Sequence, residues 1–357
     1  MLIDYVTSKA SAGAEVAYPL LHFRRDLAEA GLRIRFRFEL GYQTKEEKPD
    51  VLILSEPYFR DQYESNSSFA KVRDSVLKAA FAQSRKYTGK LVFFDTGAST
   101  ASTYLEYLPY VDLMLKRQVL SDRGHYCTDA YSRKPCVWVD ELEQWERPKA
   151  NPDHIHKLKV GWNLAYRNYS LLRKGGRHFH WRGITWNPAF TKVNKPRLIL
   201  TSFRGQFSGV RGSHRRAAIT AMSEMHHPAI VVGVPVARRH YLRELKSSKA
   251  VVSPFGHGEP CYRDIEAFIH GAILVKPSMA HVDTFPNVYK EHETYIPVDW
   301  NFHELPTVLE NIDTHYEEMK SIAQAGQRLH QALLTDSQPF VSHFKSIVSD
   351  LLDTRAC

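Results

Sequence analysis

The most informative segment of the chain is residues 241–277, YLRELKSSKAVVSPFGHGEPCYRDIEAFIHGAILVKP. Its small and β-branched residues at 250–253 predict a buried strand, and a loop rich in glycine and proline follows. The loop leads into a predicted helix over residues 262–270, which Gly271 ends, and residues 272–275 predict the next strand. This order of strand, helix and strand predicts one unit of a parallel sheet.

The same alternation extends from this segment in both directions. In the second half, we expect strands at 197–201 and 230–232 and helices at 212–225 and 240–246. In the first half, we expect strands at 2–6, 33–38, 51–54 and 91–94, with helices over 15–30 and 68–84; the basic and apolar alternation of 33–38 is typical of an edge strand. The chain is therefore predicted to be an α/β protein of two Rossmann-like lobes with helices on both faces of each parallel sheet.

The length of the chain also indicates two domains. Its 357 residues are more than one domain with a single hydrophobic core usually contains. The 43% of apolar residues are enough to form two such cores. We expect an amino-terminal lobe over 1–165, a linker over 166–195, a second lobe over 196–335 and a carboxy-terminal helix within 336–357. The apolar stripe of that helix should pack back on the lobes; it comprises Phe340, Phe344, Ile347, Val348 and Leu351.

Charge and cysteine content indicate the partners and the compartment. Lys and Arg number 48 against 39 Asp and Glu, a net charge of +9, which favours anionic partners or simply provides a solubilising surface. The four cysteines form no CxxC pair, the chain starts without a secretory signal, and no apolar run could span a membrane. We therefore expect a cytoplasmic protein, with peripheral association at the inner membrane face as a further expectation.

The loop and helix after the strand at 250–253 have the features of a phosphate site. Glycines let backbone amides approach a ligand, and the amino end of a helix attracts anions. Arg263, Glu266 and His270 share one face of the helix, where a carboxylate can accept hydrogen bonds from a ribose diol. The alternative is that Arg263 and Glu266 are an ordinary surface ion pair.

The order of residues here resembles a known family. Ser248, Pro254 and Gly256, then Arg263, Glu266 and Ala267, then Gly271, Ile273 and Val275 resemble the nucleotide-sugar lobe of exostosin-like and related two-lobed (GT-B) glycosyltransferases. The resemblance implies that Glu266 holds the nucleotide ribose. It also implies that the preceding loop and the helix start face the diphosphate; the residues concerned are Ser253, Gly256, His257, Gly258, Glu259 and Tyr262. Many retaining relatives have seven residues between two glutamates, whereas six separate Glu259 from Glu266, so we expect an inverting reaction.

A second basic segment, TSFRGQFSGVRGSHRR, follows the first strand of the second half at residues 201–216. Its arginines suit a diphosphate because each presents a fixed fork of donors, and it resembles the F-x-G…R motif of the same family. The donor-binding candidates here are Arg204, Gly205, Arg211 and Arg215. Surface or interlobe ion pairs are the alternative. The segment lacks the stripe of Lys and Arg with interleaved aromatics that favours nucleic-acid binding, so we expect no nucleic-acid partner.

The first half is expected to supply the acceptor site and a general base. Asp95, at the end of the strand 91–94, is the first candidate, followed by Glu56 and His125. The alternatives are a helix cap or turn for Asp95, a turn for Glu56 and a solvated loop residue for His125.

These patterns together predict an enzyme without a cofactor. Histidine pairs occur, but none has metal-ligand spacing, so we expect no metal. The expected reaction moves a hexosyl or pentosyl group from a nucleotide-diphosphate sugar to a hydroxyl of a glycan or lipid-linked glycan, as in polysaccharide biosynthesis. The alternatives are a non-catalytic nucleotide- or glycan-binding module of the same fold and a nucleotide-sugar epimerase.

Overall fold

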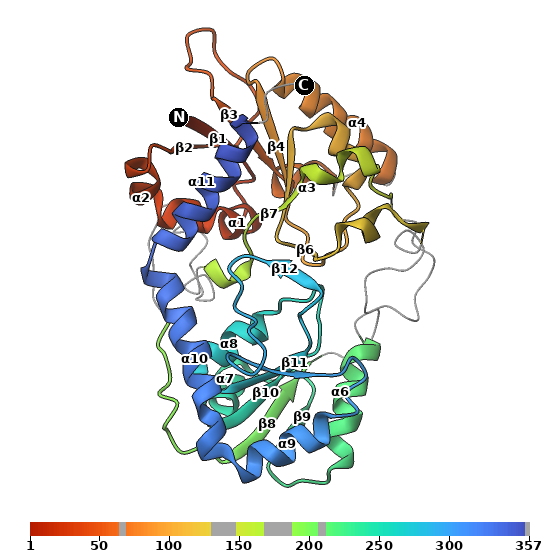
Figure 1. Cartoon of the computed structure of the whole chain (residues 1–357), viewed down its shortest axis with the longest axis vertical. Helices are drawn as coiled ribbons and strands as arrows, with labels where there is room; N and C mark the ends of the chain where they lie inside the picture. Colours follow the sequence, from red (N-terminus) through yellow and green to blue (C-terminus); the bar gives the residue numbers. More distant parts are fainter. Residues whose placement is uncertain (64–68, 130–147, 168–187, 206–211, 354–357) are drawn as a thin grey trace.

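A computed structural model describes residues 1–63, 69–129, 148–167, 188–205 and 212–353, and it consists of two α/β lobes (Figure 1). The first lobe contains a six-stranded sheet in the order β2-β1-β3-β4-β5-β7, and all its neighbouring strands are parallel. Its strands are β1 (Leu2–Val6), β2 (Arg33–Arg37), β3 (Val51–Ser55), β4 (Lys90–Asp95), β5 (Leu113–Lys116) and β7 (Leu158–Val160). The described helices of this lobe are α1 (Ser11–His22), α2 (Arg24–Glu29), α3 (Glu56–Tyr63) and α4 (Phe69–Ser84), with 3-10 helices η1 (Leu105–Tyr110), η2 (Arg123–Cys127), η3 (Pro152–Lys157) and η4 (Leu164–Tyr166).

The second lobe repeats this plan with five parallel strands in the order β13-β11-β10-β8-β9. Its strands are β8 (Ile199–Arg204), β9 (Ile230–Gly233), β10 (Ser248–Val252), β11 (Ile273–Pro277) and β13 (Ile296–Val298). Its described helices are α6 (Gly212–Glu224), α7 (Arg238–Ser247), α8 (Tyr262–His270), α9 (Leu305–Thr314) and α10 (Tyr316–Thr335). In both lobes the first strand lies between the second and the third, which is the switch point where open parallel sheets hold ligands. The predicted α/β fold of two Rossmann-like lobes is confirmed.

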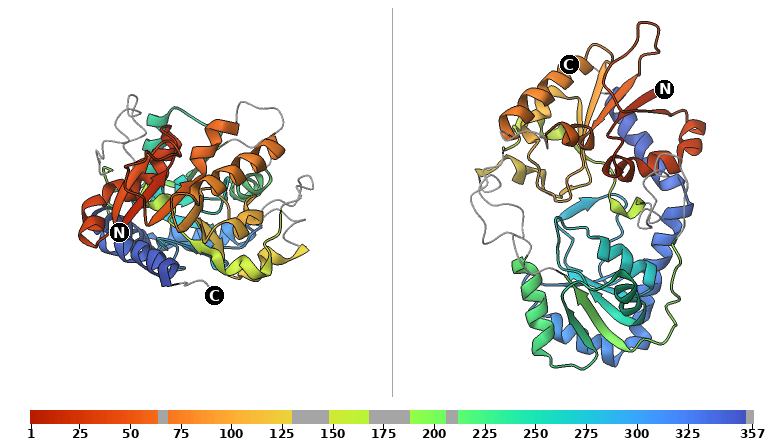
Figure 2. Two further views of the ribbon diagram at one scale, coloured as in Figure 1. Left: turned by 90° about the horizontal axis from the view of Figure 1, so that it is seen from above. Right: turned by 180° about the vertical axis from the view of Figure 1, so that it is seen from behind.

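The lobes are joined by a two-stranded sheet and by the last helix. Strand β6 (Gln118–Leu120) pairs antiparallel with β12 (Val282–Thr284), and α11 (Gln338–Asp353) returns to the first lobe. Figure 2 shows α10 and α11 running along one side of both lobes. The Phe340 and Phe344 rings of α11 lie 5.6 and 6.0 Å from the Trp162 ring of the first lobe. The predicted carboxy-terminal amphipathic helix is thus confirmed, and the arrangement is the GT-B architecture.

One hydrophobic core is shared by the lobes. A cluster of buried residues runs from Ile3 and Tyr5 of the first sheet through Trp162 and Phe340 to Val251 of the second. Each sheet has a second cluster of buried residues on its opposite face. Because one core is continuous, the two sheets have a defined mutual position that fixes the cleft between them.

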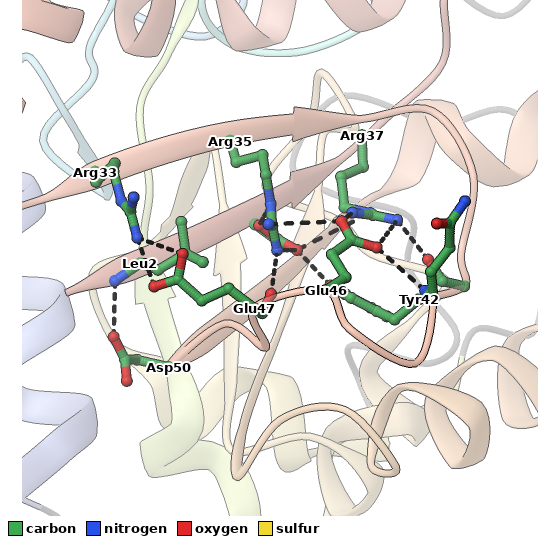
Figure 3. Close-up of polar contacts among 11 residues, drawn as sticks. Leu2, Arg33, Arg35, Arg37, Tyr42, Glu46, Glu47 and Asp50 are labelled. Atoms are coloured by element: carbon green, nitrogen blue, oxygen red, sulfur yellow. Dashed lines mark hydrogen bonds and ion pairs between the residues drawn. The ribbon is translucent and has the colours of Figure 1, made fainter.

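Strand β2 is the edge strand that the sequence predicts. Figure 3 shows the side chains of Arg33, Arg35 and Arg37 reaching from β2 toward Glu46 and Glu47 of the following loop. Arg35 also makes a bidentate pair with the fully buried Asp4, at 2.7 and 2.8 Å. Part of the basic charge of β2 is therefore paired with carboxylates of the first lobe itself.

Two boundaries differ from the prediction. The expected helix over 15–30 is two helices, α1 and α2, which meet at Phe23. Pro19 lies inside α1 and has no backbone N–H to donate, which weakens the turn before the break. Residues 158–160, which lie within the expected amino-terminal lobe but were not expected to form a strand, supply β7 to the first sheet. The domain limits at 165, 196 and 335 stay a prediction, and residues 168–187 lie outside the described chain.

Candidate active site

A cleft of about 750 Å³ lies between the lobes. Its walls are the segments that follow the carboxyl ends of strands from both sheets, where parallel sheets bind their ligands. The first lobe contributes the start of α1, Pro57, most of the segment 95–104 and Arg117. The second lobe contributes Arg215, Tyr241, most of the segment 256–263 and Glu266.

Local interactions position helix α8 at this cleft. The helix begins with a capping box, in which the Asp264 carboxylate accepts a hydrogen bond from the Cys261 N–H at 2.8 Å. It ends at Gly271, whose positive φ of 61° suits glycine. Ile265 and Phe268 are buried, so the opposite face directs Arg263 and Glu266 toward the cleft.

Buried polar residues of the second lobe stabilise the loop before α8. Asp264 accepts hydrogen bonds from Ser253 and from the Tyr289 hydroxyl, the latter at 2.8 Å, and it lies 3.2 Å from the buried Lys276. Ser253 therefore stabilises the loop from within the second lobe, and the structure does not bring it to the cleft. Its buried position at the end of β10 explains the difference.

His214 of α6 also stabilises the loop before α8, and this role was not predicted from the sequence. Its Nδ1 accepts the Phe255 N–H at 3.2 Å, its Nε2 lies 3.1 Å from the Trp300 carbonyl, and its ring stacks on Trp300. Burial lowers the pKa of His214 to about 4, so the imidazole is neutral at pH 7. A neutral ring is required because Nδ1 acts as the acceptor.

Arginines of the second lobe line two neighbouring cavities, and Arg263 lines both of them. Arg263 lines the main cleft, stacks on Phe203 and donates to the Arg204 carbonyl at 3.1 Å. Arg215 lies beside the loop: a Cβ added to Gly256 would be 3.6 Å from its Nη2. Arg204 instead pairs with Glu244 at 2.7 Å, and this pairing raises the Arg204 pKa.

The cavity that Arg204 lines is smaller, about 280 Å³, and shares Tyr241 and Arg263 with the main cleft. Arg204 is thus adjacent to the cleft without lining it. Gly205 is buried against Phe203 and does not line the cleft either. Arg211 lies outside the described residues.

Glu266 lies at the junction of these cavities. Its Oε2 accepts a hydrogen bond from the Tyr241 hydroxyl at 2.7 Å, and its Oε1 is 3.9 Å from Arg238. The side chain remains 12% exposed and lines the cleft together with Tyr262 and His257. The structure therefore brings together Gly256, His257, Gly258, Tyr262, Arg263, Arg215 and Glu266 at one wall.

Asp95 lines the opposite wall, but other groups already bind its carboxylate. Oδ1 accepts the Gly97 N–H at 2.8 Å, and Oδ2 accepts the Ser102 hydroxyl at 2.6 Å. Lys116 lies 3.1 Å away, and both charged side chains are almost completely buried. This arrangement orders the segment 95–104 and leaves little of the carboxylate open to a substrate.

The structure does not bring the other two base candidates to the cleft. Glu56 is buried behind the wall, where it accepts a hydrogen bond from Thr96 at 2.7 Å. The side chain of His125 is 66% exposed and lies near Asp122, away from the cleft-lining residues. Glu259 is fully buried and bonds to Thr100 of the first lobe, so its side chain does not line the cleft.

Two residues at the first-lobe wall, Glu15 and Arg117, were not predicted from the sequence. Glu15 of α1 lines the cleft, pairs with Arg167 at 2.8 Å and lies 3.3 Å from the Tyr262 hydroxyl. Glu15 could have been predicted from its position just after the small-residue turn that follows β1, because ligands of parallel sheets often contact such turns.

Among the described residues, no group of three or more His, Cys, Asp or Glu side chains is placed to hold a metal. None of the helices in the described parts of the chain is long and apolar enough to cross a membrane. The cytoplasmic and membrane-surface expectations stay predictions.

Comparisons with known proteins give fold-level likenesses only. No family model and no curated protein matches the sequence. An alpha-glucosyltransferase solved with UDP-glucose and DNA containing an abasic site is 12% identical, with 98% of this chain and 99% of that chain covered and a TM-score of 0.48. The beta-glucosyltransferase solved with and without uridine diphosphoglucose is 12% identical, covering 98% and 100%, with a TM-score of 0.46.

A third similar structure is the pneumococcal O-GlcNAc transferase GtfA with UDP and GlcNAc. It is 9% identical over 85% of this chain and 57% of that chain, with a TM-score of 0.43. None of these three is described as exostosin-like, so that part of the resemblance stays a prediction.

One prediction is contradicted by these comparisons. From the sequence we expected no nucleic-acid partner, whereas similar alpha-glucosyltransferase structures contain DNA. The exclusion relied on the lack of a continuous basic stripe with aromatics. A folded protein can contact phosphates from separate loops and helix ends, so that criterion was too narrow.

Proposed function

We propose that this protein is a glycosyltransferase that transfers a sugar from a nucleotide-diphosphate sugar to a hydroxyl group. The observation that carries the proposal is the cleft between the lobes, which Arg263, Arg215 and Glu266 of one lobe line together with Glu15 and Asp95 of the other. Such a cleft can hold a charged donor against a separate acceptor. Neither lobe alone provides both walls.

The donor is proposed to lie along the second-lobe wall. Its diphosphate would contact the loop around Gly256 and the guanidinium groups of Arg215 and Arg263, which stabilise the charge that develops on the leaving diphosphate. Its ribose would bond to Glu266, and the smaller cavity beyond Tyr241 would receive the base. We propose that these arginines make a metal unnecessary.

The acceptor is proposed to lie along the first-lobe wall, which carries Glu15 and Asp95. As the acceptor oxygen bonds to the anomeric carbon, its proton passes to a carboxylate and the bond to the diphosphate breaks. Glu15 suits this role better than Asp95, because its side chain is 22% exposed whereas that of Asp95 is 2% exposed. The inverting outcome stays part of the proposal, supported by the direction of Glu259 away from the cleft.

The experiment combines UDP- and GDP-sugars with acceptors of two classes: oligosaccharides, free or lipid-linked, and DNA with hydroxymethyl bases. Transfer to either class supports the proposal, and Arg263→Ala should lower turnover about 10²–10³-fold. The exposed Glu310→Gln change is the control. Isomerised sugar in the absence of acceptor would identify an epimerase, and tight nucleotide binding without any turnover would identify a binding module.

A further inference from the structure

Glu259 belongs to the second lobe by sequence but bonds to the first. Its Oε2 accepts the Thr100 backbone N–H at 2.9 Å, and its Oε1 accepts the Thr100 hydroxyl at 2.7 Å. The Gln118 side-chain amide lies 3.4 Å from Oε2. Glu259 is 0% exposed, so this carboxylate is removed from water between the lobes.

The backbone beside Glu259 is fitted to the same contact. A Cβ added to Gly258 would lie 1.5 Å from the Ala98 carbonyl oxygen, so only glycine permits this approach. The Gln118 amide also donates to the Ala98 carbonyl. The contact therefore involves backbone and side chains from both lobes.

The contact joins the two walls of the cleft directly. Thr100 belongs to the segment 95–104, most of which lines the first-lobe wall, and Glu259 belongs to the segment 256–263 of the opposite wall. A buried carboxylate is stable only where donors replace its water. Those donors come from the first lobe, so the carboxylate is satisfied in a dry site only when the walls are together.

We propose that Glu259 is a positioning residue that couples the donor-facing loop to the acceptor-facing loop. It sets the distance between the walls and does not bind the donor itself. The roles of the two walls rest on the proposed function, whereas the contact between them does not.

The first test measures hydrogen exchange of the Thr100 amide in the full-length protein. Glu259→Gln and Thr100→Val should each weaken the contact, because one loses the anionic acceptor and the other loses the hydroxyl donor. We expect Thr100 exchange to accelerate about 10- to 100-fold in Glu259→Gln. Thr100→Ser, which retains the hydroxyl, and the exposed Glu310→Gln should match the wild type. Unchanged exchange in Glu259→Gln would overturn the proposal.

The second test compares nucleotide affinity with turnover. For a positioning residue, we expect Glu259→Gln to lower kcat about 10-fold or more while the Kd for the nucleotide stays near the wild-type value. Thr100→Val should behave in the same way and Thr100→Ser should restore kcat. A loss of nucleotide affinity in Glu259→Gln that equals the loss of kcat would instead make Glu259 a donor ligand. If the wild type transfers no sugar, the proposed function fails, and the exchange measurement still decides the role of Glu259.

Discussion

Asp95 has a role in stability that its position at the end of a strand does not reveal. Because Lys116 is completely buried beside it, Asp95→Asn leaves an unpaired charge inside the first lobe. We expect the free energy of unfolding to fall by about 3–5 kcal/mol, measured by urea denaturation. The double variant Asp95→Asn/Lys116→Met should recover much of this loss.

The same substitution distinguishes this role from catalysis. If Asp95→Asn folds with wild-type stability but loses transfer activity, Asp95 is the general base and the structural interpretation is wrong. Glu15→Gln is the matched change on the same wall. It should lower kcat about 10²–10⁴-fold while nucleotide affinity is retained.

Glu266 is expected to act in binding. Removal of its carboxylate in Glu266→Ala loses hydrogen bonds to a ribose and should raise the Kd for UDP or GDP about 10- to 100-fold. Isothermal titration measures this change, and Glu310→Gln is the exposed control. Equal affinities in Glu266→Ala and the wild type would remove Glu266 from the site.

At the residue scale, spacing predicted some site residues and missed others for a physical reason. Arg263 and Glu266 could be predicted together because helical periodicity fixes which side chains share a face. The contacts of Glu259 with Thr100 and of Glu15 with Tyr262 join residues far apart in the chain. No local pattern encodes such pairs, so they required the structure.

At the level of elements, the loop between β10 and α8 depends on one glycine. In Gly258→Ala the added methyl group would meet the Ala98 carbonyl, and backbone atoms yield less readily than a flexible side chain. We expect a loss of about 1–3 kcal/mol in the free energy of unfolding, read from urea denaturation. Gly89→Ala is the matched control, since nothing lies within 4 Å of its added Cβ. Equal effects of the two changes would contradict a close approach at Gly258.

The elements themselves could largely be predicted from the sequence. Buried parallel strands such as β3 and β10 appear as short apolar runs, and Gly271 marks the end of α8. The break between α1 and α2, the short strands β5, β6, β7, β12 and β13, and the helices α3, α9 and α10 were missed. Short strands are specified by pairing partners rather than by their own composition.

At the scale of the whole molecule, buried histidines predict loss of stability in acid. Burial lowers the pKa of His214, His270 and His330 to about 4, from an ordinary value of 6.5. Below pH 6.5 the unfolded chain binds protons that the folded chain excludes, so stability falls as the pH falls from about 6.5 toward 4. Each histidine contributes about 1.4 kcal/mol per pH unit within that window.

Urea midpoints at pH 7.5, 6.5 and 5.5 measure this effect. His214→Gln should reduce the slope below pH 6.5, because it removes one of the three buried imidazoles. A stability that stays constant from pH 6.5 to 5.5 would contradict the proposed neutral state of these rings.

The proposed site spans both lobes, so the most direct measurement locates nucleotide binding over the whole chain. Amide hydrogen exchange of the full-length protein is recorded with and without saturating UDP-sugar or GDP-sugar. We expect one of them to slow exchange in residues 253–266 and to leave unchanged residues 85–89, which precede β4 at the amino end of that strand. Protection confined to other segments, or no binding of either donor, would contradict a nucleotide-sugar site in this cleft.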